Sequence, residues 1–526
     1  YRSEGSKLHL AEKAGAIFGD AIQTAVLLNR LHPQQGYAAL AFEFAEKSRA
    51  TVLLDALNEA DAKKFAGIPG TLLNRERQLK IDLTFYKQKL AEEKLKREAV
   101  DSAKLKEWQN RAFDLEQAYD QLVGHFENTF PEYYNLKYQV NTVSAKDVQN
   151  HLLNPHSALI EYFIERDSLF IFAISVDQFE IKTVKIDSSL EREILQLREG
   201  IITQNDTKYA GAAYRLYQLL LEPVQENIAG KNLVIIPDGL LTYVPFEALL
   251  TEKPSEGYGG LSYLLKKHRV SYAYSATLLW ETIHRSRQKA KKEYLAFAPI
   301  FSNNLPAETR NMEFMQANYT LDSTRSSYFS HLPATRAEVL NIRNLFQEKA
   351  GFFQRLFGNP AEVFLESEAN EANLKSYNLQ NFRYLHFATH GIANSINPKL
   401  SGLILAQQNN ENEDNILHLE EIYNLSLNAD LVTLSACETG LGKIAKGEGL
   451  IGLTRGFLYA GAANLLVSLW QINDVSTAHL MEAFYRNMLE GQSKPEALRN
   501  AKLALMAQNE KYTKPFYWAP FILIGK

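Results

Sequence analysis

Two residues in the second half of the sequence have side chains suited to nucleophilic catalysis. Cys437, the only cysteine of the chain, follows the apolar run Leu431 to Ser435, and His390 follows the apolar run Tyr384 to Ala388. A thiol with a pKa of about 8.5 is mostly protonated at neutral pH, so a neighbouring imidazole is needed to form the thiolate and later to protonate a leaving amine. The pair therefore indicates acyl transfer with a cysteine nucleophile and a histidine base.

The single cysteine also excludes other kinds of site. One thiol cannot form an internal disulfide or a multi-thiolate zinc site, and we expect no metal centre and no cofactor, since calcium-loop and phosphate-loop motifs are missing. A buried inert thiol and a redox sensor remain open as alternatives to the nucleophile. A redox sensor would need a resolving cysteine from another molecule, because Cys437 has no partner within the chain.

An acyl-transfer site also needs donors for the negative oxygen of the tetrahedral intermediate. The backbone N–H groups of Gly391 and Cys437 are the candidates for this oxyanion hole, because a glycine permits close approach of the backbone to a substrate. We find no G-x-S-x-G motif, which disfavours esterase-like chemistry on a serine.

The elements that would position these residues are short apolar strands separated by helical patterns. This alternation predicts an α/β fold with a mostly parallel sheet covered on both faces by helices. In such sheets, functional groups gather at the carboxyl ends of the strands. If the strands before His390 and Cys437 are parallel and adjacent, the two side chains face the same edge. The expected strands are 158–164, 169–175, 179–186, 232–236, 294–298, 363–365, 384–388, 431–435, 464–469 and 521–524.

Two further residues of this region invite a structural interpretation. His386 lies inside an apolar run, so we expect a hydrogen-bonded histidine of the core rather than a catalytic one. Glu338 follows Thr335 by three positions, the spacing of a capping box at the start of a helix.

The chain divides into four expected parts. Residues 1–60 are helical and could be the end of a tetratricopeptide-repeat (TPR) array, although no 34-residue self-similarity is visible. Residues 61–135 carry two apolar stripes at helical spacing, which predict a long antiparallel helical hairpin. Residues 136–288 and 289–526 form two successive α/β halves.

Several sequence blocks resemble those of the CHAT peptidases, a branch of the caspase-like cysteine peptidases. The similarity is strongest over 290–526 and extends more loosely to about residue 140. It implies that His390 and Cys437 are the catalytic dyad, that 289–526 is the protease half with a caspase-like fold, and that 136–288 is a degenerate, pseudo-protease half. Members often carry N-terminal TPRs. The blocks are FATHG, LSACETGLG, GEGLIGLTRGFLYAGA, SLWQIND and FYWAPFILIG.

Substrate preference is less determined. A caspase motif has glutamine where this chain has Ser435, which disfavours recognition of aspartate. Resemblance to separase makes Asp474, four positions after Trp470, a candidate for binding a basic P1 side chain; Ser435 and Trp470 are further candidates for the S1 pocket. A helix N-cap role for Asp474 is an equal alternative.

Composition limits the partners. The formal charge of −4, from 57 basic and 61 acidic residues, gives no chain-wide reason to bind nucleic acid, and no apolar run indicates a membrane span or secretory signal. We therefore expect a cytoplasmic cysteine endopeptidase that cuts a protein substrate and is regulated through its helical N-terminal region, in a bacterial defence or cell-death pathway by resemblance. The alternative is a catalytically silent TPR-CHAT scaffold.

Overall fold

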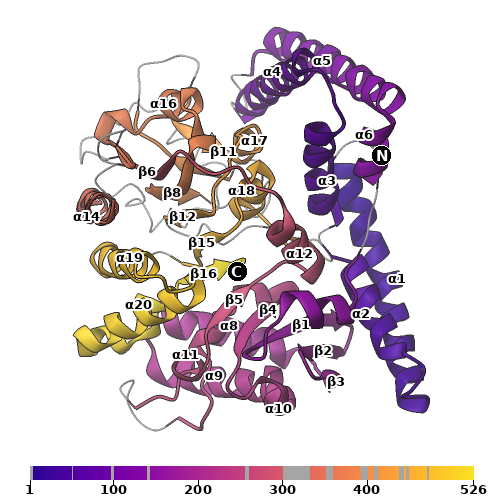
Figure 1. Cartoon of the computed structure of the whole chain (residues 1–526), viewed down its shortest axis with the longest axis vertical. Coiled ribbons are helices and arrows are strands. Elements are labelled where there is room, and N and C mark those ends of the chain that lie inside the picture. Colours follow the sequence, from indigo (N-terminus) through magenta and orange to yellow (C-terminus); the bar gives the residue numbers. More distant parts are fainter. Residues whose placement is uncertain are drawn as a thin grey trace.

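The computed structural model describes residues 4–49, 51–95, 100–138, 142–254, 260–299, 332–350, 359–392, 398, 401–407, 413–436, 443–445, 449–470 and 473–526. A helical region comes first and an α/β region follows (Figure 1). No helix among these residues is both long and apolar enough to pass through a membrane. The N-terminal helices are α1 (Glu4–Leu31), α2 (Tyr37–Lys47), α3 (Thr51–Phe65), α4 (Gly70–Leu95), α5 (Ser102–Thr129) and α6 (Pro131–Tyr138).

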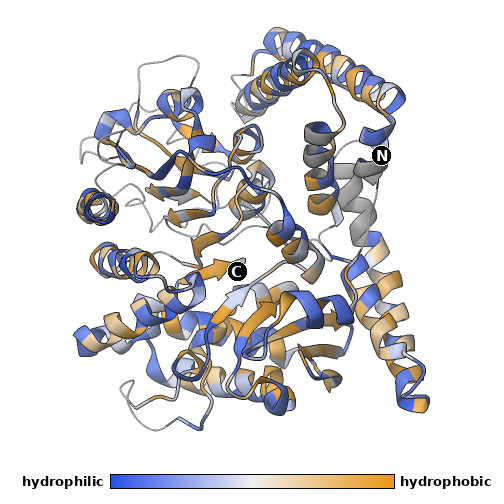
Figure 2. Ribbon diagram, in the orientation of Figure 1, coloured by the Kyte–Doolittle hydropathy of each residue, from blue (hydrophilic) through white to orange (hydrophobic). Residues whose placement is uncertain are grey.

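Helices α4 and α5 lie side by side (Figure 1). The carboxylate of Asp101 starts α5 by accepting hydrogen bonds from the N–H groups of Ala103 and Lys104, at 3.0 and 3.1 Å. Phe126 on α5 and Tyr133 on α6 belong to a small separate core under the hairpin. Hydrophilic and hydrophobic residues alternate along both helices of the hairpin (Figure 2).

One large sheet organises the rest of the chain, in the order β3-β2-β1-β4-β5-β16-β15-β12-β8-β6-β7. Neighbours pair in parallel, except β1 with β2, β2 with β3, and β15 with β16. The mostly parallel sheet predicted from the sequence is therefore confirmed. Its strands are β1 (Ser157–Glu165), β2 (Ser168–Ser175), β3 (Phe179–Lys185), β4 (Asn232–Ile236), β5 (Val270–Tyr272), β6 (Lys292–Ala298), β7 (Ala361–Leu365), β8 (Phe382–Ala388), β12 (Leu431–Ser435), β15 (Leu465–Ser468) and β16 (Phe521–Ile524).

Helices cover both faces of the sheet, as predicted. Alternate residues of β1 divide between the faces: Ile160 and Tyr162 pack in the core that contains α8 and α9, while Leu159 and Phe163 pack with residues of α1, α2 and α12. The remaining helices are α7 (Ala145–Asp147), α8 (Ser189–Ile202), α9 (Asp206–Leu220), α10 (Gln225–Ile228), α11 (Leu264–Lys267), α12 (Ala276–His284), α14 (Pro333–Lys349), α16 (Glu371–Ser376), α17 (Leu419–Tyr423), α18 (Leu453–Ala460), α19 (Asp474–Leu489), α20 (Lys494–Gln508) and α21 (Pro515–Trp518).

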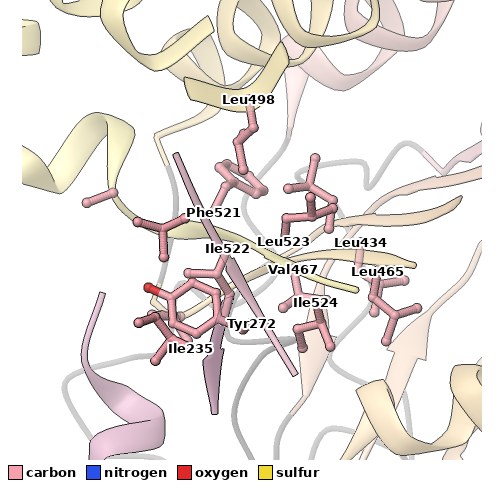
Figure 3. Packing of buried hydrophobic residues seen from close by; sticks show 14 of the residues in the cluster. Ile235, Tyr272, Leu434, Leu465, Val467, Leu498, Phe521, Ile522, Leu523 and Ile524 are labelled. Carbon is pink, nitrogen blue, oxygen red and sulfur yellow. The ribbon is translucent and has the colours of Figure 1, made fainter. Parts of the chain in front are cut away.

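The seam between the two α/β halves lies at β16. This strand pairs with β15 on one side and with β5 on the other, where Ile524 is opposite Tyr272. Figure 3 shows Ile235 and Tyr272 of the first half packed near Ile522 and Ile524 of the second half. One hydrophobic core thus extends through both halves. Because β15 and β16 are antiparallel, the strands β4 and β5 run opposite to β8 and β12.

Two small sheets were not predicted. Strands β9 (Gly391–Ile392), β10 (Gly402–Ile404) and β11 (Ile416–His418) form one, and β13 (Lys443–Ala445) and β14 (Gly449–Ile451) form the other. Strands of two or three residues are too short to show the alternation by which strands are recognised in a sequence.

Candidate active site

The candidate site lies at the carboxyl ends of β8 and β12. These strands are adjacent and parallel, with Ala388 opposite Ser435. The strands that precede residues 390 and 437 are thus parallel neighbours, as the argument from the sequence requires. Cys437, the predicted nucleophile and second oxyanion donor, lies outside the described residues.

His390 is buried, with 6% of its surface exposed. Its backbone is held by the small sheet of β9, β10 and β11. Its carbonyl accepts a hydrogen bond from the N–H of Ile404 on β10, at 2.9 Å. Gly391, the predicted oxyanion donor, begins β9 and pairs with Leu403 of the same strand β10. The small sheet therefore sets the course of the backbone at both residues.

Thr389 connects this backbone to β12. Its N–H donates to the carbonyl of Ser435, at 3.2 Å, and its hydroxyl donates to the carbonyl of Ile404. A second hydrogen bond holds Ala436, the residue directly after β12. The Ser468 hydroxyl of β15 donates to the carbonyl of Ala436. Three neighbouring backbones are thus joined directly beside positions 390 and 437.

The three S1 candidates do not share one environment. Ser435 is 2% exposed, and its hydroxyl has no hydrogen-bond partner within the described part of the chain. Trp470 is also buried, and its indole N–H donates to the carbonyl of Phe516, at 3.2 Å. Because the side chains of Ser435 and Trp470 are both buried, they pack in the interior at the ends of β12 and β15.

Asp474 lies at the start of α19, with part of its surface exposed. Its carboxylate accepts a hydrogen bond from the N–H of Ala334, at 2.8 Å, at the first turn of α14. The N-cap of α19 is Asn473, whose side chain accepts from the N–H of Ser476. The alternative prediction that Asp474 caps its own helix is therefore wrong: the carboxylate faces the neighbouring helix, where unpaired N–H groups attract it.

His386 is a core residue, as predicted, and its partner is Glu338. The side chain is fully buried, and its Nε2 lies 2.9 Å from Oε1 of Glu338 on α14. The predicted capping box was wrong, because α14 begins at Pro333 and the Thr335 hydroxyl donates to the carbonyl of Leu332 instead. Glu338 faces the sheet, and so it cannot fold back over the helix start.

A group of three carboxylates on the described residues has the spacing of a cation site, but a lysine fills it. Glu371, Glu413 and Glu421 have oxygens close enough to share one ion. The ammonium of Lys375 lies 2.6 to 2.7 Å from an oxygen of each. Burial by itself would lower the pKa of Lys375, but the carboxylates of Glu421 and Glu371 outweigh burial and raise it. Lysine is therefore the cation of this cluster.

Sequence reasoning missed a charged cluster that joins the helical region to the α/β region. Lys63 on α3 lies 2.6 Å from Glu59 and 2.8 Å from Glu76 of α4, and Lys80 lies 3.0 Å from Glu76. The ammonium of Lys80 donates to the hydroxyl of Tyr459 on α18, at 3.3 Å. Residues 80 and 459 are far apart in the sequence, so no local spacing pattern could have indicated the contact.

Comparison with known proteins places the chain among CHAT domains. The sequence model of the CHAT domain family matches residues 211–526. Two curated relatives are "Tetratricopeptide repeat protein 28" of Mus musculus and of Homo sapiens, which are 33% and 34% identical over 110 residues, or 21% of this chain. The match spans about 4% of the length of each relative.

Solved structures similar to this chain include separase and gingipain R. The Saccharomyces cerevisiae separase–securin complex has a TM-score of 0.43 and 10% identity, over 81% of this chain and 34% of that chain. The Arg-specific cysteine proteinase gingipain R has a TM-score of 0.37 and 8% identity, over 62% of this chain and 69% of that chain.

Proposed function

Because this chain belongs to the CHAT domain family, we propose that it is a cysteine endopeptidase with His390 and Cys437 as its catalytic dyad. The observation that carries the proposal is the register of β8 and β12. Ala388 is opposite Ser435, and each strand is followed two positions later by one of the two residues. Parallel strands that end together present the residues after them at a common edge.

The proposed reaction needs only these residues and water. His390 takes the proton of the Cys437 thiol, and the thiolate attacks the peptide carbonyl carbon. The N–H groups of Gly391 and Cys437 stabilise the oxyanion of the tetrahedral intermediate. His390 then gives its proton to the leaving amine as the C–N bond breaks. Water, with its proton accepted by His390, attacks the thioester, which releases the acid and restores the thiol.

For specificity we propose that Asp474 accepts a basic P1 side chain, with Ser435 and Trp470 shaping the wall around it. One oxygen of Asp474 already accepts from Ala334. Each carboxylate oxygen can accept more than one hydrogen bond, so the bond from Ala334 does not by itself exclude a guanidinium. An Asp474→Asn variant should therefore lose its preference for arginine over a neutral P1 residue and keep its reactivity toward iodoacetamide.

Regulation through the helical region is part of the proposal. Support comes from α18, which contacts α3 and α4. Lys80 of α4 donates to Tyr459 of α18, and Asn424, the residue after α17, donates to Thr84 of α4. A regulatory protein that moves the hairpin would act on α17 and α18, which flank β12 in the sequence. Cytoplasmic location, a protein substrate and a role in bacterial defence or cell death complete the proposal.

A catalytically silent scaffold is the second candidate. Large apolar side chains are exposed on α1 and α5, including Ile17, Leu31 and Phe113, with exposed fractions of 72%, 71% and 59%. Exposed apolar side chains on helices suit partner binding. A peptidase and a silent scaffold could both bind partners through this surface. Cleavage of a peptide bond by the wild-type protein would distinguish the peptidase from the scaffold.

The test combines alkylation with a search for new N-termini. Wild type, Cys437→Ala and His390→Ala are incubated with a proteome of the source cells, and new N-termini are identified by mass spectrometry. We expect new N-termini only with wild type, and iodoacetamide should label His390→Ala much more slowly than wild type. Equal labelling rates, or cleavage retained in Cys437→Ala, would remove the dyad. Matching circular dichroism spectra would show that the variants are folded.

A further inference from the structure

A cavity of about 500 Å³ lies where β1, β4 and β5 begin. Its volume falls within the range of small-molecule sites. The lining is polar and basic, and none of its residues belongs to the proposed peptidase site. The residues that matter here are Asn154, His156, Asn232, Lys267, Arg269 and Arg499.

Three permanent cations converge on this cavity, and their charge is only partly neutralised. Lys267 pairs with Glu252, at 3.2 Å, through two side chains that are about half exposed. Arg269 pairs with Glu496, at 2.7 Å. Arg499 has no carboxylate within ion-pair distance in the described part of the chain. Burial, and to a lesser extent the charge of Arg269, lower the pKa of Arg499, and the carboxylate of Glu496 opposes this shift.

The guanidinium of Arg499 is already held in place. Its Nε donates to the carbonyl of Leu265, at 2.8 Å, and its Nη2 donates to the carbonyl of Lys266, at 2.7 Å. These bonds fix the orientation of the planar group in the cavity wall, so binding an anion there requires little further ordering.

Amide groups add neutral donors to the same wall. The Asn154 oxygen accepts from the N–H of His156, at 2.9 Å, which leaves its NH2 group for other contacts. The side chain of Asn232, at the start of β4, makes no hydrogen bond within the residues that the structure describes. Amide donors beside cations are suited to binding the oxygen atoms of an anion.

The cavity also spans the seam of the sheet. Arg499 belongs to α20 of the second half, whereas Asn154, Asn232, Lys267 and Arg269 belong to the first half. Figure 3 shows Leu498, the neighbour of Arg499, packed toward Phe521 of β16. A ligand in this cavity would therefore contact both halves.

We propose that this cavity binds a small anion that carries two or more linked phosphate groups. Guanidinium and ammonium groups arranged around a polar cavity match the charge and the oxygen geometry of such a chain. A single phosphate group would contact one part of the lining, whereas linked phosphate groups can reach Arg499, Lys267 and Arg269 together. The ligand crosslinks α20 to the strands of the first half and thereby stabilises the seam.

Calorimetric titration of the full chain tests the proposal, with inorganic pyrophosphate, tripolyphosphate and ATP as probes. We expect binding that weakens as sodium chloride is added, because the contacts are electrostatic. Equal affinity for tripolyphosphate and ATP identifies the phosphate chain as the recognised group, and tighter binding of ATP identifies a nucleotide. Absence of binding heat and of any thermal shift with all three probes at millimolar concentration overturns the proposal.

Variants locate the site. Lys267→Gln removes a half-exposed side chain and should fold normally, and Arg499→Gln removes the unpaired guanidinium. Each should weaken binding about tenfold or more, the size expected for one close charge pair. Arg111→Gln, on the exposed surface of α5, is the matched control and should bind as wild type does. If Lys267→Gln and Arg499→Gln also bind as wild type does, the anion is held elsewhere and the assignment fails.

Discussion

At the scale of single residues, Thr389 has the most informative contacts beside the candidate site. Its N–H reaches Ser435 on β12 and its hydroxyl reaches Ile404 on β10, so one residue ties His390 to two neighbouring strands. Catalytic side chains need their geometry held within fractions of an ångström, and the supporting hydrogen bonds provide that precision. Thr389 is in this sense a positioning residue.

Replacing Thr389 by valine tests this role. The shape is kept and the hydroxyl is lost, so the carbonyl of Ile404 loses a partner, which should cost about 1–3 kcal/mol of stability. Thr433→Val is the matched control, because the Thr433 hydroxyl is bonded to the Tyr485 hydroxyl deeper in the sheet. We expect similar losses of stability in urea unfolding but a fall in kcat with Thr389→Val alone. An equal fall in both variants would contradict the positioning role.

The position of His386 inside an apolar run predicted a core residue, and the side chain is fully buried. The catalytic role of His390 stays a prediction. The capping box at Glu338 was wrong, and so was the N-cap role that was one of two alternatives for Asp474, because spacing along the chain cannot tell which of two nearby helices or strands a carboxylate will face. Their partners, His386 and Ala334, lie in distant segments.

At the scale of elements, the turn after α18 sets where β15 starts. Gly461 ends the helix with φ of 116°, and a Cβ there would lie 2.4 Å from the carbonyl oxygen of Leu427. The left-handed conformation and the nearby carbonyl of Leu427 both favour glycine at this position. The Cβ position is fixed by the backbone and its neighbour is a backbone oxygen, so no change of rotamer relieves the clash.

Gly461→Ala should therefore destabilise the protein by more than the roughly 1 kcal/mol expected for alanine in a left-handed conformation alone. Gly491→Ala is the matched control, since Gly491 also has a positive φ, of 95°, but open space around its Cβ position. The difference between the two variants in urea unfolding isolates the contact with Leu427. If Gly461→Ala and Gly491→Ala lower the free energy of unfolding equally, the backbone at Leu427 moves away from the new Cβ without loss of stability.

The contact between α3, α4 and α18 should weaken in acid. Burial by itself would raise the pKa of Glu59, but the ammonium groups of Lys63, Lys80 and Lys137 outweigh burial and hold that pKa at about 2. A carboxyl whose folded pKa is depressed stabilises the fold above its unfolded value, near 4.5, and loses this contribution as pH falls from there toward 2. The contribution is at most about 3 kcal/mol.

Glu59→Gln measures this contribution. The stability difference between wild type and variant should be largest at neutral pH and shrink as pH falls from 4.5 toward 2, in urea unfolding at each pH. Hydrogen exchange over α3 to α6 should show the same trend locally. A difference that does not change with pH would mean that the Glu59 charge contributes nothing to folding.

At the scale of the whole molecule, the two α/β halves share one core and one buried ion pair. Lys502 on α20 lies 3.1 Å from Glu247, with 1% and 2% of the side chains exposed, and its ammonium also donates to the carbonyl of Phe521, at 2.6 Å. Burial lowers the pKa of Lys502. The sequence predicted the other strands of the large sheet but neither the three-residue strand β5 nor this joint, because β5 and β16 are separated by about 250 residues.

Lys502→Met should lower the free energy of unfolding by about 3–5 kcal/mol, because it leaves the Glu247 carboxylate buried without its cation. Lys208→Met, which breaks an exposed ion pair with Glu199, should cost less than about 1 kcal/mol. Tryptophan fluorescence and far-ultraviolet circular dichroism should report one transition for 142–526 in wild type. Separate transitions would show that the shared core does not couple the halves.

The position of β16 between β5 and β15 has a consequence for biosynthesis. While the chain emerges from the ribosome, β5 is made long before the strand that covers its edge. An apolar strand edge left open in this way is a template for wrong pairing with other nascent chains. Molecular chaperones that shield exposed edges should therefore associate with this protein during translation and leave once β16 has docked.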